Sequence, residues 1–100
     1  MNENFSAHYL LMQLQCGHEE VIDILYPRYA KDFYTYARHQ GFTHEDAEDI
    51  VHTTFYKILS SIAYYDVIAG AGAGWMWRIC RNLIIDMKRR KSTVNYLRRR

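Results

Sequence analysis

A chain of 100 residues, 49% of them hydrophobic, is long enough for one small domain with a modest core. Its valines, isoleucines and threonines do not alternate with polar residues, and there is one proline, so the pattern predicts an all-α fold rather than a sheet. The net charge of +2 conceals an asymmetry, because residues 1–77 carry four basic and ten acidic side chains and residues 78–100 carry nine and one. An acidic body with a basic end favours two partners of opposite charge, and a merely solvated basic end is the alternative.

The cysteines and the start of the chain bear on its compartment. Cys16 and Cys80 form no CxxC pair, which argues against a disulfide framework or zinc site and favours a reducing compartment. The first residues lack a basic segment followed by a long apolar run, so we expect no signal peptide. Apolar stretches stay below about 18 residues, so we expect no transmembrane helix. These features predict a cytoplasmic protein that does not bind a membrane.

Two amphipathic helices are expected in the first part of the chain. Residues 5–16 predict a short helix with Ser6 as its N-cap and Gly17 at its end, packed at the edge of the domain. Residues 18–39 predict a second helix, in which Pro27 either kinks the helix or begins a new segment. The tyrosines along this second helix contact a partner or, as is usual at helical spacing, close the core.

The third predicted helix, residues 44–64, has the clearest start in the chain. Thr43 and Asp46 have the spacing of a capping box, and acids in the first turns suit the helix dipole. The expected buried face consists of Ala47, Ile50, Val51, Phe55, Ile58, Leu59 and Ile62. The opposite face carries Asp46, Asp49, His52, Thr53 and Tyr56. Dipole compensation explains the first acids without any function, but it explains Asp49 and the polar residues after it less well.

A glycine-rich loop separates this helix from the last one. Residues 66–74, DVIAGAGAG, end in alternating alanines and glycines, which predict flexibility and carry nothing larger than a methyl group. The loop is not a phosphate-binding loop, because it lacks the GxxxxGK[ST] lysine and hydroxyl and no strand precedes it. The fourth helix is expected from about Ala73 to Lys91, followed by nine frayed residues.

The fourth predicted helix is amphipathic. An apolar arc of roughly 140° holds Met76, Ile79, Cys80, Leu83, Ile84 and Met87. Trp75 and Trp77 flank this arc, and the residues outside it include Arg78, Arg81, Asn82, Lys88 and Arg89. Rings beside cations suit unstacked bases, which stack on the rings while their phosphates meet Arg and Lys. The alternative is that the tryptophans close the core and the charges are only solvated.

No spacing in the chain matches a catalytic or metal site. The run from His44 to Glu48 is not HExxH, because its last residue is glutamate. Cys16 and His18 are close in sequence, but two ligands do not make a tetrahedral zinc site. We therefore expect a binding module rather than an enzyme, with no cofactor and no metal.

Three blocks of sequence stand in the order of a known family. They are LYPRY (residues 25–29), DAEDIVHTTF (46–55) and WMWRICRNLIID (75–86). Together they resemble region 2 of bacterial RNA polymerase sigma factors of the extracytoplasmic-function (ECF) group, over about residues 18–91. The resemblance implies a sigma region 2-like, all-α bundle of about four helices, with a short N-terminal helix in residues 1–17 and a basic tail in residues 92–100.

The resemblance also implies two binding surfaces. In this family the third helix docks on the clamp helices of the largest polymerase subunit, and the fourth helix and its preceding loop bind the minus-ten promoter element as a melted single strand. Polymerase-binding roles are thereby implied for Asp46, Asp49, His52, Thr53 and Tyr56. DNA-binding roles are implied for Trp75, Trp77, Arg78, Arg81, Asn82, Lys88 and Arg89. The expected partners are core RNA polymerase and single-stranded promoter DNA, and an anti-sigma factor is a further candidate.

Three departures from the family pattern bear on function. His52-Thr53 stands where Gln-Glu is usual, which removes one acid. Gly72 and Ala73 stand where the family has Phe and Arg, in a loop that helps to hold a flipped base. A second domain for the minus-thirty-five element does not follow, so we expect a shortened or partial factor.

Two other functions remain open at this point. The Gly-Ala loop favours a sigma-like protein–protein adaptor that binds polymerase or an anti-sigma factor without base-specific DNA recognition. A duplex-binding helix-turn-helix protein is the third candidate, and it needs a shorter link than the roughly nine residues before the basic helix.

Overall fold

The computed structural model describes residues 4–98, with side chains for residues 4–92. Within that range the chain forms α1 (Ala7–Gln15), η1 (Glu19–Val21), α2 (Ile22–His39), α3 (His44–Ser61), η2 (Ile62–Tyr64) and α4 (Ala73–Arg98), where η marks a 3-10 helix. No strand occurs between residues 4 and 98. The predicted all-α bundle of about four helices is therefore confirmed.

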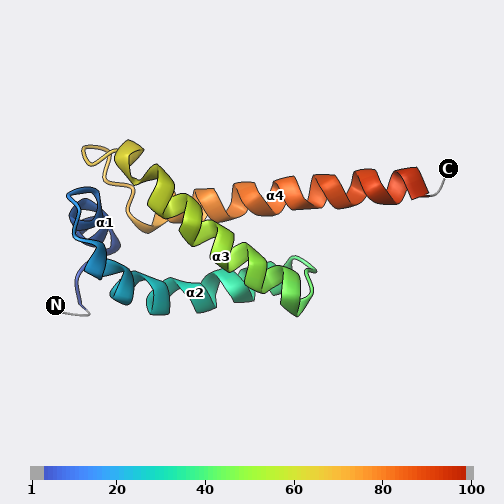
Figure 1. Ribbon diagram of the computed structural model, residues 1–100, viewed down its shortest axis with the longest axis horizontal. Helices are drawn as coiled ribbons and strands as arrows, with labels where there is room; N and C mark the ends of the chain where they lie inside the picture. Colours follow the sequence, from blue (N-terminus) through green and yellow to red (C-terminus); the bar gives the residue numbers. More distant parts are fainter. Residues whose placement is uncertain (1–3, 99–100) are drawn as a thin grey trace.

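The helices are arranged around α3, which runs back across α2 and packs against α4 on its other side (Figure 1). Helix α1 lies at the end of the bundle where α3 finishes and α4 starts. The far half of α4 projects beyond the other helices, so the molecule extends 54 Å in its longest direction and 24 and 18 Å in the others. The long basic helix thus packs on the other helices over its first part and extends beyond them.

Local capping explains where α1 and α3 begin. The Oγ of Ser6 accepts the N–H of Tyr9 at 3.1 Å, and the Oγ1 of Thr43 accepts the N–H of Asp46 at 3.2 Å. Both side chains satisfy a donor that has no partner inside the helix. The two predicted N-caps are therefore confirmed.

Several predicted boundaries shift in the structure. The second helix begins at Ile22 rather than residue 18, because residues 19–21 form the 3-10 helix η1. Pro27 lies inside α2 and begins no new segment. The third helix ends at Ser61, and residues 62–64 tighten into η2.

The fourth helix is longer than predicted. It continues past Lys91 to Arg98, so the prediction of a frayed end is wrong for residues 92–98. No glycine or proline interrupts that stretch, and extending an existing helix costs far less than starting one. Residues 99 and 100 lie outside the described part of the chain.

The core lies where α1, α2, α3 and α4 meet. Its completely buried large side chains include Leu10, Leu25, Phe33, Ile50, Ile58 and Met76. Leu59, predicted to be buried, is 44% exposed, because it lies one residue beyond the inward-facing Ile58 and is turned away from the core. No helix in residues 4–98 is both long and apolar enough to cross a membrane.

Candidate nucleic-acid and polymerase interfaces

A pocket of about 380 Å³ opens where the glycine-rich loop meets the first turns of α4, and we call it the loop pocket. It is lined by Tyr65, Asp66, Ala69, Ala71, Gly74, Trp75, Arg78 and Arg81. Three of the predicted DNA-binding residues, Trp75, Arg78 and Arg81, therefore meet at one place beside the loop. The volume falls within the ~300–1,000 Å³ typical of pockets for small organic groups.

The loop pocket combines an aromatic ring with positive charge. Trp75 is half-buried, and its ring meets that of Tyr65 nearly edge-on, with 5.0 Å between centroids and an interplanar angle of 62°. Arg78 and Arg81 are both exposed. The side chain of Asp66 is occupied by the loop itself, since its Oδ1 accepts the N–H groups of Ile68 and Ala69, each at 3.0 Å. The pocket thus suits a flat aromatic ligand that carries negative charge.

Trp77 lies on a different side of α4 and packs on α2. Its ring meets Phe33 edge-on at 4.8 Å and Tyr36 at 5.6 Å between centroids. The two tryptophans, which the sequence placed on either side of one apolar arc, are therefore separated. The packing favours the core interpretation for Trp77, while Trp75 remains at a candidate ligand site.

The basic run of α4 is tied to the turn between α2 and α3. The Nζ of Lys88 donates to the side-chain oxygen of Gln40 at 2.7 Å. The Nζ of Lys91 lies 2.6 Å from Asp46 Oδ2 and 5.0 Å from the ring centroid of Phe42. Lys88 therefore lies at this turn. It is seven residues, or about 10 Å, along α4 from Arg81 at the loop pocket. Asn82 and Arg89, also predicted to bind DNA, are exposed on α4.

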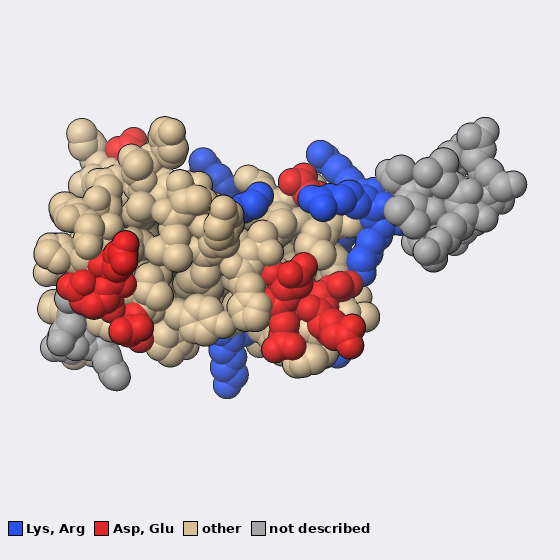
Figure 2. Space-filling model, viewed as in Figure 1, with Lys and Arg blue, Asp and Glu red and all other residues tan. Residues whose placement is uncertain are grey.

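Charge is divided over the surface, as Figure 2 shows: acidic side chains gather over the start of α3, and Lys and Arg gather along α4. Among the predicted polymerase-binding residues, Asp49, His52 and Tyr56 are exposed, and Tyr56 keeps 70% of its surface in solvent. Thr53 is half-buried. Asp46 is also half-buried, and its carboxylate is paired with Lys91. Two acids of this face are therefore paired, Asp46 with Lys91 and Glu48 with His44, and Asp49 lies exposed beside them.

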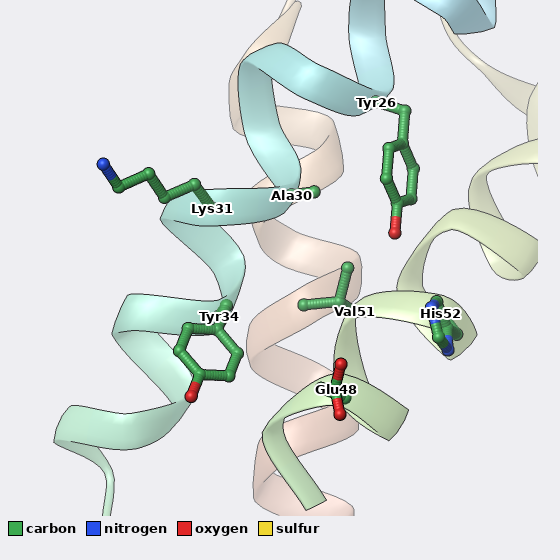
Figure 3. Close-up of a pocket in the computed structure, with 7 residues that line it drawn as sticks. All are labelled: Tyr26, Ala30, Lys31, Tyr34, Glu48, Val51 and His52. Carbon is green, nitrogen blue, oxygen red and sulfur yellow. The ribbon is translucent and has the colours of Figure 1, made fainter. Parts of the chain in front are cut away.

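A second hollow, the interhelix groove, lies between α2 and α3 and encloses about 220 Å³. It is lined by Tyr26, Ala30, Lys31, Tyr34, Glu48, Val51 and His52 (Figure 3). Val51 lies between the two tyrosine rings, and Lys31 points away from them. His52 alone among these seven was predicted to be functional, because the tyrosine stripe of α2 reads in sequence as core.

The thiol of Cys80 lies in the core. Burial raises the pKa of the Cys80 thiol, against smaller lowering effects from the Thr54 side chain and the charge of Arg81. Cys80 is therefore held as the neutral, inert thiol. Within residues 4–98, no three His, Cys, Asp or Glu side chains gather as they would around a metal ion.

Comparison with known proteins connects these features to one family. Residues 25–94 match the family model of sigma-70 region 2. The ECF RNA polymerase sigma factor SigE of Mycolicibacterium smegmatis is 33% identical to the chain over 72 residues, which are 72% of this chain and 27% of that protein. A comparison with solved structures finds no match. Members of the sigma family are transcription initiation factors rather than enzymes. The chain therefore belongs to the sigma-70 family, as a region 2 domain of the ECF group.

Proposed function

We propose that this domain recognises a promoter, binding the minus-ten element as a melted single strand while α3 docks on core RNA polymerase. The observation that carries the proposal is the loop pocket, where Trp75, Arg78 and Arg81 meet the backbone of the loop. A base that has left its stack can rest on an aromatic ring, and guanidinium groups bind the phosphates on either side of it.

The concave shape of the loop pocket favours a single strand over a duplex. A paired base reaches such a pocket only after unstacking and unpairing, which costs a few kcal/mol, whereas a melted strand has already met that cost. Asn82 is exposed one turn beyond Arg78 on the same face of α4. Its uncharged amide can donate to and accept from a base edge, so it suits base discrimination rather than phosphate binding.

The other half of the proposal concerns polymerase docking. Asp49, His52 and Tyr56 present an exposed and partly acidic strip on α3, beside the interhelix groove. Such a surface complements a basic partner, as expected of the clamp helices of the largest polymerase subunit. An anti-sigma factor that covered the same strip would prevent docking.

The experiment measures anisotropy of labelled minus-ten DNA, single-stranded and duplex, at several salt concentrations with and without core polymerase. We expect tight binding of the single strand with polymerase present. Arg78→Ala and Arg81→Ala should each reduce the slope of log affinity against log salt concentration, the salt slope, by about 0.7, because each removes one phosphate contact. Asn82→Ala should lower discrimination among minus-ten sequences and leave the slope unchanged.

A matched control lies on the same helix. Arg90 is exposed about 14 Å beyond Arg81 along α4, so Arg90→Ala should leave base discrimination at the parent value. Equal binding of duplex and single strand would refute the single-strand proposal. If the substitutions near the loop pocket leave both slope and discrimination unchanged while the domain still binds polymerase, α4 is a scaffold and the domain acts as a protein–protein adaptor.

A further inference from the structure

Tyr65 joins three segments that are distant in sequence. Its side chain is 3% exposed, and its hydroxyl oxygen accepts the backbone N–H of Gly72 at 2.8 Å. The same hydroxyl lies 2.6 Å from Nδ1 of His8 in α1. The hydroxyl oxygen can accept the Gly72 amide and still bond to His8, as donor or as acceptor according to which ring nitrogen of the histidine carries the proton. A chain of hydrogen bonds therefore runs from α1 through Tyr65 to the glycine-rich loop.

The loop also rests directly on α1. Gly72 has φ +58, and a Cβ added there would lie 3.4 Å from the backbone nitrogen of His8 and 3.5 Å from its Cβ. Gly70 has φ +64, and a Cβ there would lie 3.6 Å from Cε1 of the same histidine. A Cβ at either position would make ordinary van der Waals contact with His8, so it is the left-handed backbone that favours glycine at both. The stretch predicted to be a flexible linker is thus a shaped loop seated on the first turn of α1.

The other end of α1 holds the backbone before the loop. The side-chain amide of Gln15 donates to the carbonyl oxygens of Ile62 at 3.0 Å and Tyr65 at 2.9 Å. Gln15 and His8 are seven residues apart and therefore share one face of α1. Helix α1 therefore contacts Tyr65 twice. Gln15 bonds to the main-chain oxygen of Tyr65, and His8 bonds to its side-chain hydroxyl.

These hydrogen bonds hold a residue of the loop pocket, because the Tyr65 ring lines the pocket and meets Trp75. Helix α1 lies wholly outside residues 25–94, the segment that matches sigma-70 region 2. We infer that α1 is a working part of the DNA site: His8 and Gln15 act through Tyr65 as positioning residues that fix the loop pocket for base discrimination. The inference rests on the proposed function for its DNA role, and the hydrogen bonds themselves can be tested without DNA.

The first test measures amide hydrogen exchange of the whole chain by NMR. Tyr65→Phe removes the hydroxyl and keeps the ring, so protection of the Gly72 amide should fall roughly threefold to tenfold. The matched control is Tyr64→Phe, since Tyr64 is the neighbouring tyrosine and is 85% exposed. It should leave Gly72 unchanged. Equal Gly72 protection in the parent and Tyr65→Phe would overturn the inference.

Variants of His8 separate α1 from Tyr65 itself. His8→Ala should also speed exchange at Gly72, and His8→Asn should restore most of the protection, because its side-chain amide can bond to the Tyr65 hydroxyl either as acceptor or as donor. If Tyr65→Phe exposes Gly72 while neither His8 variant changes its exchange, the tyrosine holds the loop alone and the role of α1 is refuted.

The second test compares affinities for matched and base-substituted minus-ten single strands, with core polymerase present. Tyr65→Phe and His8→Ala should lower the ratio of matched to mismatched affinity roughly threefold to tenfold and leave polymerase affinity unchanged. If exchange at Gly72 speeds up while the ratio of matched to mismatched affinity stays unchanged, the hydrogen bonds exist but the positioning role is refuted. A parent chain that binds no single strand would instead refute the proposed function and the DNA role of α1 with it.

Discussion

Alanine in place of Trp77 should destabilise the domain and leave its DNA affinity intact. The ring packs edge-on against Phe33, which is completely buried, and against Tyr36, at 4.8 and 5.6 Å between centroids. Truncating a core tryptophan costs about 3–5 kcal/mol, and we expect about 3 kcal/mol because Trp77 is half-buried. That is a large share of the roughly 5–15 kcal/mol that stabilises a domain of this kind.

Alanine in place of Trp75 should instead lower the affinity for DNA more than the stability of the domain. Its ring lines the loop pocket, and stacking of one base is worth about 1–3 kcal/mol, so affinity for the single strand should fall about 5- to 150-fold. The loss of the edge contact with Tyr65 should lower stability by a further 0.5–1.5 kcal/mol or so. The ratio of the two effects therefore distinguishes a ligand-binding ring from a core ring.

Urea unfolding followed by circular dichroism gives the stability of each variant, and anisotropy gives the affinity per folded molecule. Tyr64→Ala removes an aromatic ring that is 85% exposed, so it should match the parent in both measurements. Equal affinity losses in Trp75→Ala and Trp77→Ala, at equal folded fraction, would contradict the separation of the two rings. Unchanged affinity in Trp75→Ala would place the base elsewhere on the domain.

Four further predictions concern the rest of the molecule. Asp49→Arg should weaken binding to core polymerase by a few kcal/mol through charge repulsion, with helicity unchanged; unaltered affinity would mean that this strip does not dock. A double-mutant cycle on Asp46 and Lys91 should give a coupling of about 0.2–1 kcal/mol that shrinks with salt, because both side chains are partly exposed; a coupling insensitive to salt would contradict an exposed pair. The exposed Cys16 should react with a thiol reagent far faster than Cys80, and equal rates would contradict the burial of Cys80. Burial raises the pKa of Cys80 from its ordinary value of 9.0, so the unfolded chain loses this proton at a lower pH than the folded one. The stability that the neutral thiol contributes is therefore complete below pH 9.0 and declines above it. Cys80→Ala should remove this decline from urea midpoints measured against pH.

The helices and the family could be predicted from the sequence because both depend on short-range patterns. Ser6 and Thr43 mark helix starts through hydrogen bonds that span three residues. Apolar spacing identified Met76 and Cys80 as buried residues of α4, and both are completely buried. Leu59 was misassigned because helical phase gives only an approximate direction, and the neighbouring helices decide how far along that direction the core extends.

The sites depended on contacts that no local pattern encodes. Trp75 and Trp77 look alike in sequence, and their different surroundings come from α2 packing against Trp77 and the loop against Trp75. The pairing of Asp46 with Lys91 joins residues 45 apart, so a residue predicted to contact polymerase also makes an ion pair within the domain.

The glycine-rich loop shows the same division most clearly. Its composition determined that the backbone could adopt left-handed turns and approach another segment closely, and from sequence alone that freedom reads as flexibility. In the folded chain the loop lies against His8, which is 57 residues before Tyr65, and its Gly72 donates to the Tyr65 hydroxyl. Glycine only permits a conformation, and which permitted conformation the chain adopts is selected by the hydrogen bonds and packing of segments that meet only after folding.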